Sequence, residues 1–236
     1  MTRLALTAAM EATWPPAQRR RLGPWTIRDG QGGGKRVAAA TAESGIGPGD
    51  IEQAEAAMAA LGQPRLFMIG AGHGALDSEL QARGYAIIDP VVLYSGPLNI
   101  LTDTPVPPVS GFTIWPPLAI MADIWAAGGI GAARLAVMHR VKGPKTGVLA
   151  RHADQPAGAA FAALHEDIAM IHAIEVAPAH RRRGVGANIL RAAAHWAQDR
   201  GAARLGLAVT RENAGANALY ASLGMTVVGH YHYRIK

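Results

Sequence analysis

The residues best suited to chemistry form one segment, 176–187. A hydrophobic run that predicts a strand, 168–176, leads into Pro178, three arginines, two glycines and an amphipathic helix. The start of a helix presents unpaired backbone N–H groups at the positive end of the helix dipole, which favours a bound anion. Gly184 and Gly186 let the backbone approach phosphate oxygens closely, and arginines add forked, charged donors. The segment therefore predicts a pyrophosphate site.

Other kinds of site are disfavoured by composition and spacing. The chain has no cysteine, which excludes disulfides, a thiol nucleophile, a thiolate zinc site and a cysteine-ligated iron–sulfur cluster. Its histidines show no helical i, i+4 pair, so we predict no metal site. Residues 70–74 follow a strand but lack the full dinucleotide fingerprint, and residues 32–35 lack P-loop spacing. A hairpin turn is the better interpretation of residues 32–35.

The elements that must position the pyrophosphate segment belong to the second half of the chain. Three prolines in residues 102–110 predict a linker. Beyond it, hydrophobic periodicity and turn residues predict the order β-α-α-β-β-β-α-β-α-β. The predicted strands are 112–115, 146–152, 159–164, 168–176, 205–209 and 225–234, and the predicted helices are 118–127, 131–141, 185–200 and 216–223.

The first half is a weaker copy of this pattern. Its predicted strands are 25–28, 36–41, 66–69 and 85–88, and its predicted helices are 51–61 and 75–83. Residues 76–89 stand where residues 217–229 stand in the second half, which indicates a diverged internal duplication. Residues 43–50 replace the arginine-rich loop, and their two acids and lack of arginine would repel a pyrophosphate.

Two motifs in the second half resemble a known family. Arg181-x-x-Gly184-x-Gly186, after Val176-x-Pro178, resembles the acetyl-CoA motif of the GCN5-related N-acetyltransferases (GNAT). The later Asn213-x-x-Ala216-x-x-Leu219-Tyr220 and the final Tyr231 to Arg234 are also similar to that family. The resemblance covers about residues 110–236.

The resemblance implies an α/β fold, the GNAT acyl-CoA N-acyltransferase fold with a mixed sheet, in two tandem units. We expect a diverged GNAT-like domain at 1–101, a linker at 102–110 and a catalytic GNAT domain at 111–236. Such an arrangement is similar to that of some bacterial members with two domains.

The resemblance also implies acetyl-CoA as cosubstrate and a set of residues that bind it. Backbone N–H groups of the glycine loop would hold the pyrophosphate, and the preceding strand would pair with the pantetheine arm beside a splay in the sheet. Asn213 would contact the pantetheine side or order its loop. The implied binding residues are Ile174, Glu175, Val176, Arg181, Arg182, Arg183, Gly184, Val185, Gly186, Ala187, Asn213, Ala216 and Tyr220.

Catalysis in this family needs an acid and a base but no enzyme nucleophile, because the amine attacks the thioester directly. The resemblance implies that Tyr220 donates a proton to the leaving thiolate, although a packing role is also open. Many relatives carry a glutamate where this chain has Met170, so His172 and Glu175 are the candidate bases. Strand alternation places His172 on the face of Ile174, with Glu175 on the other face. His172 could instead be a core histidine.

Three functional hypotheses follow. The leading one is an N-acetyltransferase that moves the acetyl group of acetyl-CoA to a primary amine. The alternative is a non-catalytic acyl-CoA sensor or protein-interaction module of the same fold. Nucleic-acid binding is disfavoured, because the one tight arginine cluster already belongs to the cofactor loop.

Composition sets the remaining expectations. The net charge is +6, from 23 Lys and Arg against 17 Asp and Glu. Arginine supplies most of it, through either compositional bias or an anion-binding surface. No apolar run reaches a membrane span and no clear cleavage site follows Met1 to Met10. We therefore expect a cytoplasmic protein, a monomer or homodimer, that binds neither nucleic acid nor membrane.

Overall fold

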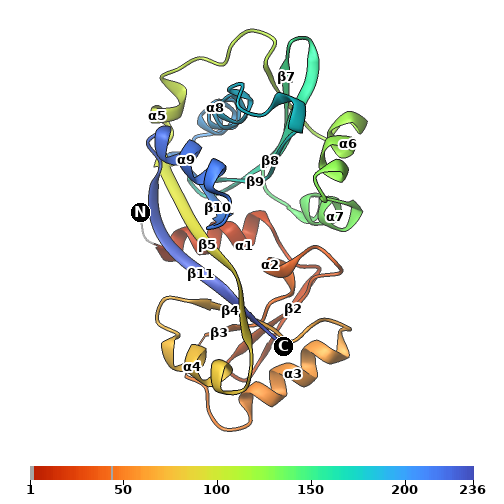
Figure 1. Cartoon of the computed structure of the whole chain (residues 1–236), viewed down its shortest axis with the longest axis vertical. Helices are drawn as coiled ribbons and strands as arrows, with labels where there is room; N and C mark the ends of the chain where they lie inside the picture. Colours follow the sequence, from red (N-terminus) through yellow and green to blue (C-terminus); the bar gives the residue numbers. More distant parts are fainter. Residues whose placement is uncertain (1–2, 44) are drawn as a thin grey trace. The chain divides into compact units, whose positions relative to one another are not determined.

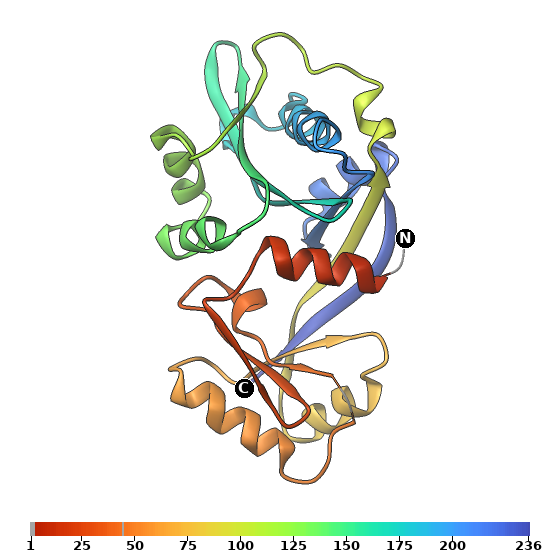
Figure 2. The same ribbon diagram turned by 180° about the vertical axis from the view of Figure 1, so that it is seen from behind.

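The computed structural model describes residues 3–43 and 45–236, and Met1, Thr2 and Ser44 lie outside the described residues. Figures 1 and 2 show the course of the chain. It forms two compact units, each assembled from separate segments. Unit 1 comprises Met1–Trp14, Leu93–Val209 and Asn213–Val228, and unit 2 comprises Pro15–Val92, Thr210–Glu212 and Gly229–Lys236.

The chain segments that make up these units differ from the two continuous segments expected from the sequence. Residues 102–110 lie inside unit 1, which also takes in Met1–Trp14. Strands β5 (Ala86–Pro97) and β11 (Thr226–Ile235) each begin in one unit and end in the other. An internal duplication with a boundary at residues 102–110 stays a prediction.

Unit 1 contains the element order expected for the second half of the chain, with a short 3₁₀ turn added. The first helix, α1 (Arg3–Thr13), and α5 (Asn99–Thr102) were not foreseen. The other elements are β6 (Gly111–Ile114), α6 (Ala119–Ala127), α7 (Ala132–Arg140), β7 (Lys145–His152), β8 (Gln155–His165), β9 (Ile168–Val176), η1 (Pro178–His180), α8 (Val185–Gln198), β10 (Arg204–Thr210) and α9 (Ala214–Ser222).

The sheet of unit 1 runs β11-β5-β10-β9-β8-β7-β6. Strands β6 to β9 pair antiparallel, whereas β9 and β10 pair in parallel. Helix α8 contacts β6 to β9, and α1 and α6 contact β8 and β9. In Figures 1 and 2, α8 lies along one face of these strands, and α1 and α6 lie along the other. The helix that follows the arginine loop is thus packed against the four strands β6 to β9 of the sheet.

Apolar spacing explains why α8 and α1 lie where they do. In α8, the apolar residues Val185, Ile189, Ala193 and Trp196 recur at helical spacing and are buried. In α1, the buried residues Leu6, Ala9, Met10 and Thr13 also recur at three- and four-residue intervals. The signal for α1 was therefore present in the sequence.

A β-bulge in β9 overturns the expected alternation of its side chains. His172 pairs with Phe161 and Glu175 with Ala159, so the two β9 residues between these pairs lie opposite a single residue of β8. The extra residue is Ala173, whose φ is +51°. Because a bulge shifts the period-two pattern by one residue, His172 and Glu175 lie on the same face and not on opposite faces.

Unit 2 is a smaller α/β arrangement. Its three-stranded sheet has the order β1-β2-β3, and β4 pairs antiparallel with the end of β11. Its complete elements are β1 (Gln18–Leu22), β2 (Trp25–Asp29), α2 (Lys35–Ala38), β3 (Thr41–Ala42), α3 (Asp50–Ala60), β4 (Leu66–Gly70) and α4 (Gly74–Ala82).

One predicted strand of unit 2 was wrong. Residues 36–41 form the helix α2 and then enter the two-residue strand β3, and the preceding glycine run connects β2 to this helix. Lys35, Arg36 and Ala38 are good helix formers, and burial of Val37 favours the compact turn. The glycine-rich turn before these residues was therefore a weak signal for a strand here.

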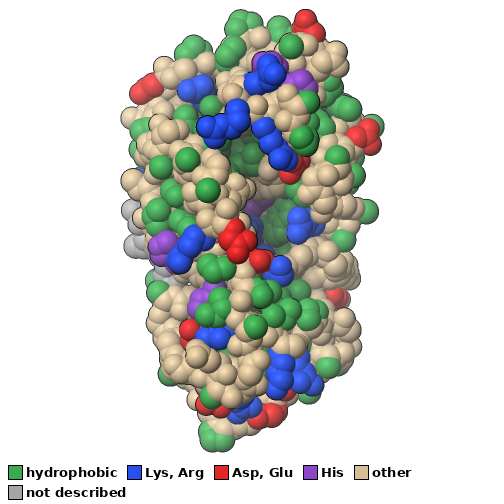
Figure 3. Space-filling view, in the orientation of Figure 1, with side chains coloured by type: hydrophobic (Ala, Val, Ile, Leu, Met, Phe, Trp, Pro, Cys, Tyr) green, Lys and Arg blue, Asp and Glu red, His purple; other side chains and the backbone are tan. Residues whose placement is uncertain are grey.

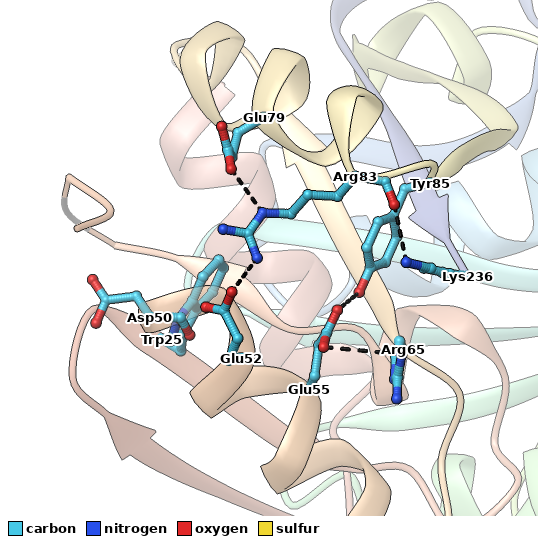
Figure 4. A network of polar contacts seen from close by, with 9 residues as sticks. All are labelled: Trp25, Asp50, Glu52, Glu55, Arg65, Glu79, Arg83, Tyr85 and Lys236. Atoms are coloured by element: carbon cyan, nitrogen blue, oxygen red, sulfur yellow. Dashed lines mark hydrogen bonds and ion pairs between the residues drawn. The ribbon is translucent and has the colours of Figure 1, made fainter. Parts of the chain in front are cut away.

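Polar contacts tie α3, α4 and the strands of unit 2 together (Figure 4). The Arg83 guanidinium, near the end of α4, binds Glu79 at 2.7 Å and also Glu52 of α3. The Tyr85 hydroxyl donates to Glu55. Burial is the main cause that raises the pKa of Tyr85, and the hydrogen bond to Glu55 adds to it. These links surround an apolar core that includes Trp25, Phe67 and Leu80.

Candidate functional site

A cleft of about 690 Å³ lies in unit 1 between the end of β9, the start of α8 and helix α9. Most of the residues named from the sequence line it. On the face shown in Figure 3, Lys and Arg side chains border a hollow in the upper part of the view. The predicted residues in the cleft wall are Ile174, Glu175, Val176, Arg181, Arg182, Gly184, Val185, Gly186, Ala187, Asn213, Ala216 and Tyr220.

The start of α8 is shaped to receive an anion. Gly184, its N-cap residue, has φ 78° and makes no side-chain cap. No capping side chain therefore accepts a hydrogen bond from the first backbone N–H groups of α8. A Cβ added at Gly184 would meet nothing within 4 Å, whereas one at Gly186 would lie 2.9 Å from Leu219 Cδ2. Gly184 leaves room beside the N–H groups, and Gly186 lets α8 approach α9.

Strands β9 and β10 separate beside this helix start. Their parallel pairing ends at Met170 with Gly206, although β9 continues to Val176. The edge of Ile174 to Val176 that faces away from β8 is thus available for another extended chain. Such an edge can bind the amide-containing arm of a ligand as an added strand.

Tyr220 lies at the wall of the cleft beside the splayed strands. It is 5% exposed, and its ring lies 5.6 Å from that of Tyr94 in an edge-on arrangement. Burial, with a smaller contribution from Tyr94, raises the pKa of Tyr220 to about 12. The phenol therefore stays protonated near neutral pH and can donate a proton.

Asn213 orders the turn that precedes α9. Its Oδ1 accepts a hydrogen bond from Ala216 N at 3.0 Å, which makes it the N-cap of the helix. Its carbonyl accepts from Asn217 Nδ2 at 2.8 Å. The structure thus gives Asn213 the loop-ordering geometry named as one of its two possible roles.

The bulge in β9 turns Glu175 toward α6 and the cleft. Trp125 of α6 donates from Nε1 to the Ala173 carbonyl at 2.8 Å, which holds the bulge in place. A Cβ added at Gly128 would lie 2.5 Å from both Cδ and Oε2 of Glu175. Glycine at position 128 therefore provides the space that the carboxylate occupies. Arg181 Nη2 lies 3.3 Å from Glu175 Oε1.

His172 is not brought to the cleft wall. It is 5% exposed and stacks near Trp14 and Phe161. Thr13 donates to the Ala9 carbonyl at 2.6 Å, so its oxygen accepts from His172 Nε2 at 2.9 Å. The Nε2 proton is thus used in a hydrogen bond to Thr13 inside the core, which matches the core-histidine alternative. Arg183 is exposed and does not line the cleft.

Sequence reasoning missed His180. It lines the cleft, and its ring lies 5.5 Å from that of His152. Its position between Pro178 and Arg181, inside the recognised motif, was the signal that could have found it. Leu219 and Ser222 also line the cleft, from the α9 face opposite α8.

Unit 2 has a similar helix start, but its first helical residue is acidic. Gly49, the N-cap of α3, has φ 80°, close to that of Gly184. Here, however, Asp50 Oδ2 accepts from Gly47 N at 2.7 Å. This carboxylate places a negative charge near the start of the helix, where a phosphate would otherwise bring one. That this loop repels a pyrophosphate stays a prediction.

Comparisons with known proteins agree with this geometry. Residues 125–225 match the model of the acetyltransferase (GNAT) family. The match spans α7 to α9 together with the end of α6, and so includes every residue of the cleft wall. The segment that holds the cleft is therefore similar to the GNAT family over 101 of the 236 residues of the chain.

Two curated relatives match short stretches of the chain. The uncharacterized N-acetyltransferase YobR of Bacillus subtilis (strain 168) is 41% identical over 63 residues, which are 27% of this chain and 26% of that protein. Streptothricin acetyltransferase of Streptomyces lavendulae is 46% identical over 59 residues, 25% of this chain and 31% of that protein. The aligned stretches thus span less than a third of either relative.

Solved structures extend the likeness of fold over nearly the whole chain. A GCN5-related N-acetyltransferase from Kribbella flavida has a TM-score of 0.71 at 18% identity and covers 98% of this chain and 94% of its own. A tandem GNAT protein from the clavulanic acid biosynthesis pathway has a TM-score of 0.60 at 13% identity, over 96% and 86% of the two chains. At these identities the likeness concerns the fold alone. It agrees with the expected α/β fold of two GNAT-like units.

Residues 3–43 and 45–236 contain neither a membrane-spanning helix nor a cluster of metal ligands. No helix there has the length and apolar character needed to cross a membrane. Within the same residues, no group of three or more metal-binding side chains is placed to hold an ion.

Proposed function

We propose that this protein transfers the acetyl group of acetyl-CoA to a primary amine. One observation carries the proposal: a single cleft combines the open start of α8, the splayed edge of β9 and the protonated Tyr220. These are a site for a pyrophosphate, a site for an extended amide chain and an acid, in the order in which acetyl-CoA would need them.

The residues of the cleft fit this cosubstrate. Backbone N–H groups at the start of α8, with Arg182 beside them, would hold the pyrophosphate. The edge of Ile174 to Val176 would pair with the pantetheine arm. The thioester would then lie beside Tyr220, where β9 and β10 part. When bound, acetyl-CoA supplies the activated acyl group.

Two side chains would then move the protons. Glu175, directly or through water, accepts a proton from the ammonium form of the acceptor. The neutral amine attacks the thioester carbon, so that a C–N bond forms and the C–S bond breaks. Tyr220 gives its proton to the departing sulfur, and the second proton lost by nitrogen restores the phenol through solvent. One proton is released in each turnover.

The acceptor is proposed only as a primary amine. The relative named streptothricin acetyltransferase makes streptothricin a reasonable member of an acceptor panel. The panel should also contain polyamines, an aminoglycoside and a peptide with a free N-terminus. The expectation of a cytoplasmic monomer or homodimer, independent of nucleic acid, stays a prediction.

The test combines binding with turnover. Acetyl-CoA should raise the melting temperature, because it binds only the folded chain, and one amine of the panel should release free CoA thiol. Tyr220→Phe should retain acetyl-CoA binding but lower kcat by about 10²–10⁴-fold, the usual contribution of a general acid. Tyr94→Phe is the matched control, because this hydroxyl bonds Asn217 instead of lining the cleft.

The possible outcomes separate the hypotheses. Failure of millimolar acetyl-CoA to bind would reject the proposed function. Binding without thiol release across the whole panel would favour the acyl-CoA sensor. Equal activity of the Tyr220→Phe and wild-type proteins would remove Tyr220 from the chemistry.

A further inference from the structure

Arg181 makes two contacts at the end of β9 that bear on the proposed reaction. Its Nη2 lies 3.3 Å from Glu175 Oε1, and its Nε donates to the Val176 carbonyl at 3.1 Å. All three residues line the cleft. The Arg181 side chain is 58% exposed and that of Glu175 is 19% exposed. One arginine thus engages both the carboxylate proposed as base and a carbonyl of the cofactor-binding edge.

The surroundings of Glu175 make Arg181 the cation that controls it. The carboxylate lies against Gly128 on one side, where no side chain intervenes, and meets Arg181 on the other. While Arg181 pairs with Oε1, an ammonium group that approaches the carboxylate meets a second positive charge. The base is therefore least available to a cationic acceptor when this ion pair is formed.

The proposed position of the pyrophosphate, at the start of α8, is also close to Arg181. Arg181 precedes the N-cap Gly184 by three residues, and its neighbour Arg182 has φ 61° and also lines the cleft. A pyrophosphate carries more negative charge than a carboxylate and accepts forked bonds from a guanidinium. A pyrophosphate at the start of α8 would therefore attract Arg181 away from Glu175.

We propose that Glu175 and the pyrophosphate of acyl-CoA compete for Arg181, so that cofactor binding frees Glu175 to accept the proton of the amine. This inference rests on the proposed function. It makes Arg181 a positioning residue that couples the two ends of the cleft, with acyl-CoA bound before the amine. No covalent change accompanies the exchange, which replaces one ion pair by another.

Competition predicts that removal of the carboxylate charge tightens cofactor binding. Glu175→Gln should bind CoA about two- to fivefold more tightly than wild type in calorimetric titrations at low salt, the range of a partly exposed ion pair. Its rate of thiol release should fall, because the base is lost. Glu166→Gln is the matched control, since it removes the same charge from an exposed turn residue outside the cleft wall.

A double variant separates competition for Arg181 from simple repulsion between Glu175 and phosphate. In an Arg181→Met background, Glu175→Gln should give no further tightening, because the contested arginine is gone. Direct repulsion would leave the same two- to fivefold gain in that background. Melting curves of each variant check that the comparison concerns folded proteins.

The result that overturns the inference is distinct from failure of the proposed function. If wild type binds CoA and Glu175→Gln binds no more tightly than Glu166→Gln, competition for Arg181 is rejected and the proposed function stands. A gain that persists in the Arg181→Met background also rejects it. If wild type binds no CoA at all, both proposals are overturned together.

Discussion

At the scale of single residues, the site depends on what stands next to each reactive group. Glu175 is one residue among nine in β9, and its neighbours alone set it apart. A bulge turns it toward α6, Gly128 leaves room for its carboxylate, and Arg181 neutralises it. Each of these three features can be changed by itself to test the proposed role of Glu175.

A substitution at Gly128 is the most selective test of the placement of Glu175. Gly128→Ala keeps an ordinary backbone conformation, because φ at this position is −86°. The new Cβ would lie within 2.6 Å of Cγ, Cδ and Oε2 of Glu175, so this flexible side chain must swing away. We expect acetyl transfer to fall by about 10- to 100-fold, since misplacement by about 1 Å can cost that much. Thiol-release kinetics with a melting curve measure both consequences.

Gly131→Ala is the matched control for this prediction. It lies in the same connection between α6 and α7, has φ −88°, and a Cβ there would meet nothing within 4 Å. Its activity and melting temperature should equal those of wild type. Full activity in Gly128→Ala would show that the placement of Glu175 is irrelevant to turnover.

At the scale of elements, sequence patterns were reliable where one face of a long element is buried. The stripe of α8 is buried, and all ten elements expected for residues 111–236 are present, because the strands there are continuous apolar runs bounded by turn residues. The bulge at Ala173 was not predictable, since its sequence reads as an unbroken strand and the Trp125 contact that fixes it comes from 48 residues away. Alternation therefore misassigned His172 and Glu175.

The candidate site was predictable to a similar degree. The motif that begins at Arg181 and the segment that ends at Tyr220 meet in one cleft, although 39 positions separate them in the sequence. The sequence could not distinguish His172 from Glu175 as the base, because the distinction depends on Thr13 of α1 and on Gly128, which directly follows α6. Both partners are remote in sequence and belong to other elements.

One ion-pair cluster joins two elements of unit 2 and yields a pH-dependent prediction. Asp77 of α4 bonds Arg234 at 2.7 Å and His232 at 2.9 Å, and Arg234 is 4% exposed. The hydrogen bond from Arg234, with a smaller one from His232, holds the pKa of Asp77 below its usual 3.8. Asp77→Asn should destabilise the protein by about 2 kcal/mol at pH 7, because Arg234 loses its charged partner.

The sign of the pH effect follows from the direction of the shift. A carboxyl group with a lowered folded-state pKa stabilises the protein fully above its unfolded-state value and loses this contribution as pH falls through the lower, folded-state value. The melting temperatures of wild type and Asp77→Asn should therefore differ at pH 7 and converge below about pH 4. Asp123→Asn, at an exposed position, should show no such difference. A gap that persists at pH 2 would contradict the assignment.

At the scale of the whole molecule, the excess of arginine has more than one origin. Arg28 and Arg234 are buried, and each bonds a backbone carbonyl, of Ala39 and Tyr85 respectively, at 3.0 and 2.9 Å. Arg181 and Arg182 line the cleft. Part of the net charge thus serves the interior and part serves the proposed anion site, so it does not require a nucleic-acid partner.

The segments that make up unit 1 predict whether an isolated fragment of the chain can fold and bind CoA. The continuous segment 111–236 contains every residue of the cleft wall but lacks α1 and β5. Leu6 of α1 packs on Gly206, where a Cβ would lie 2.3 Å from Leu6 Cδ1, and Tyr94 of β5 packs on Tyr220. We expect the isolated fragment to show no cooperative melting and no CoA binding. Far-UV circular dichroism and calorimetry measure these two properties.

A cut in the chain, as opposed to a deletion, should be tolerated. Residues 102–110 contain exposed positions such as Val109, which is 60% exposed, and most of them lie outside any helix or strand. A protease site placed there would break one bond while both pieces remain packed in unit 1. The nicked protein should therefore bind CoA like the intact chain. If the isolated fragment binds CoA equally well, the segment 111–236 is an independent domain, and α1 and β5 are dispensable for the cleft.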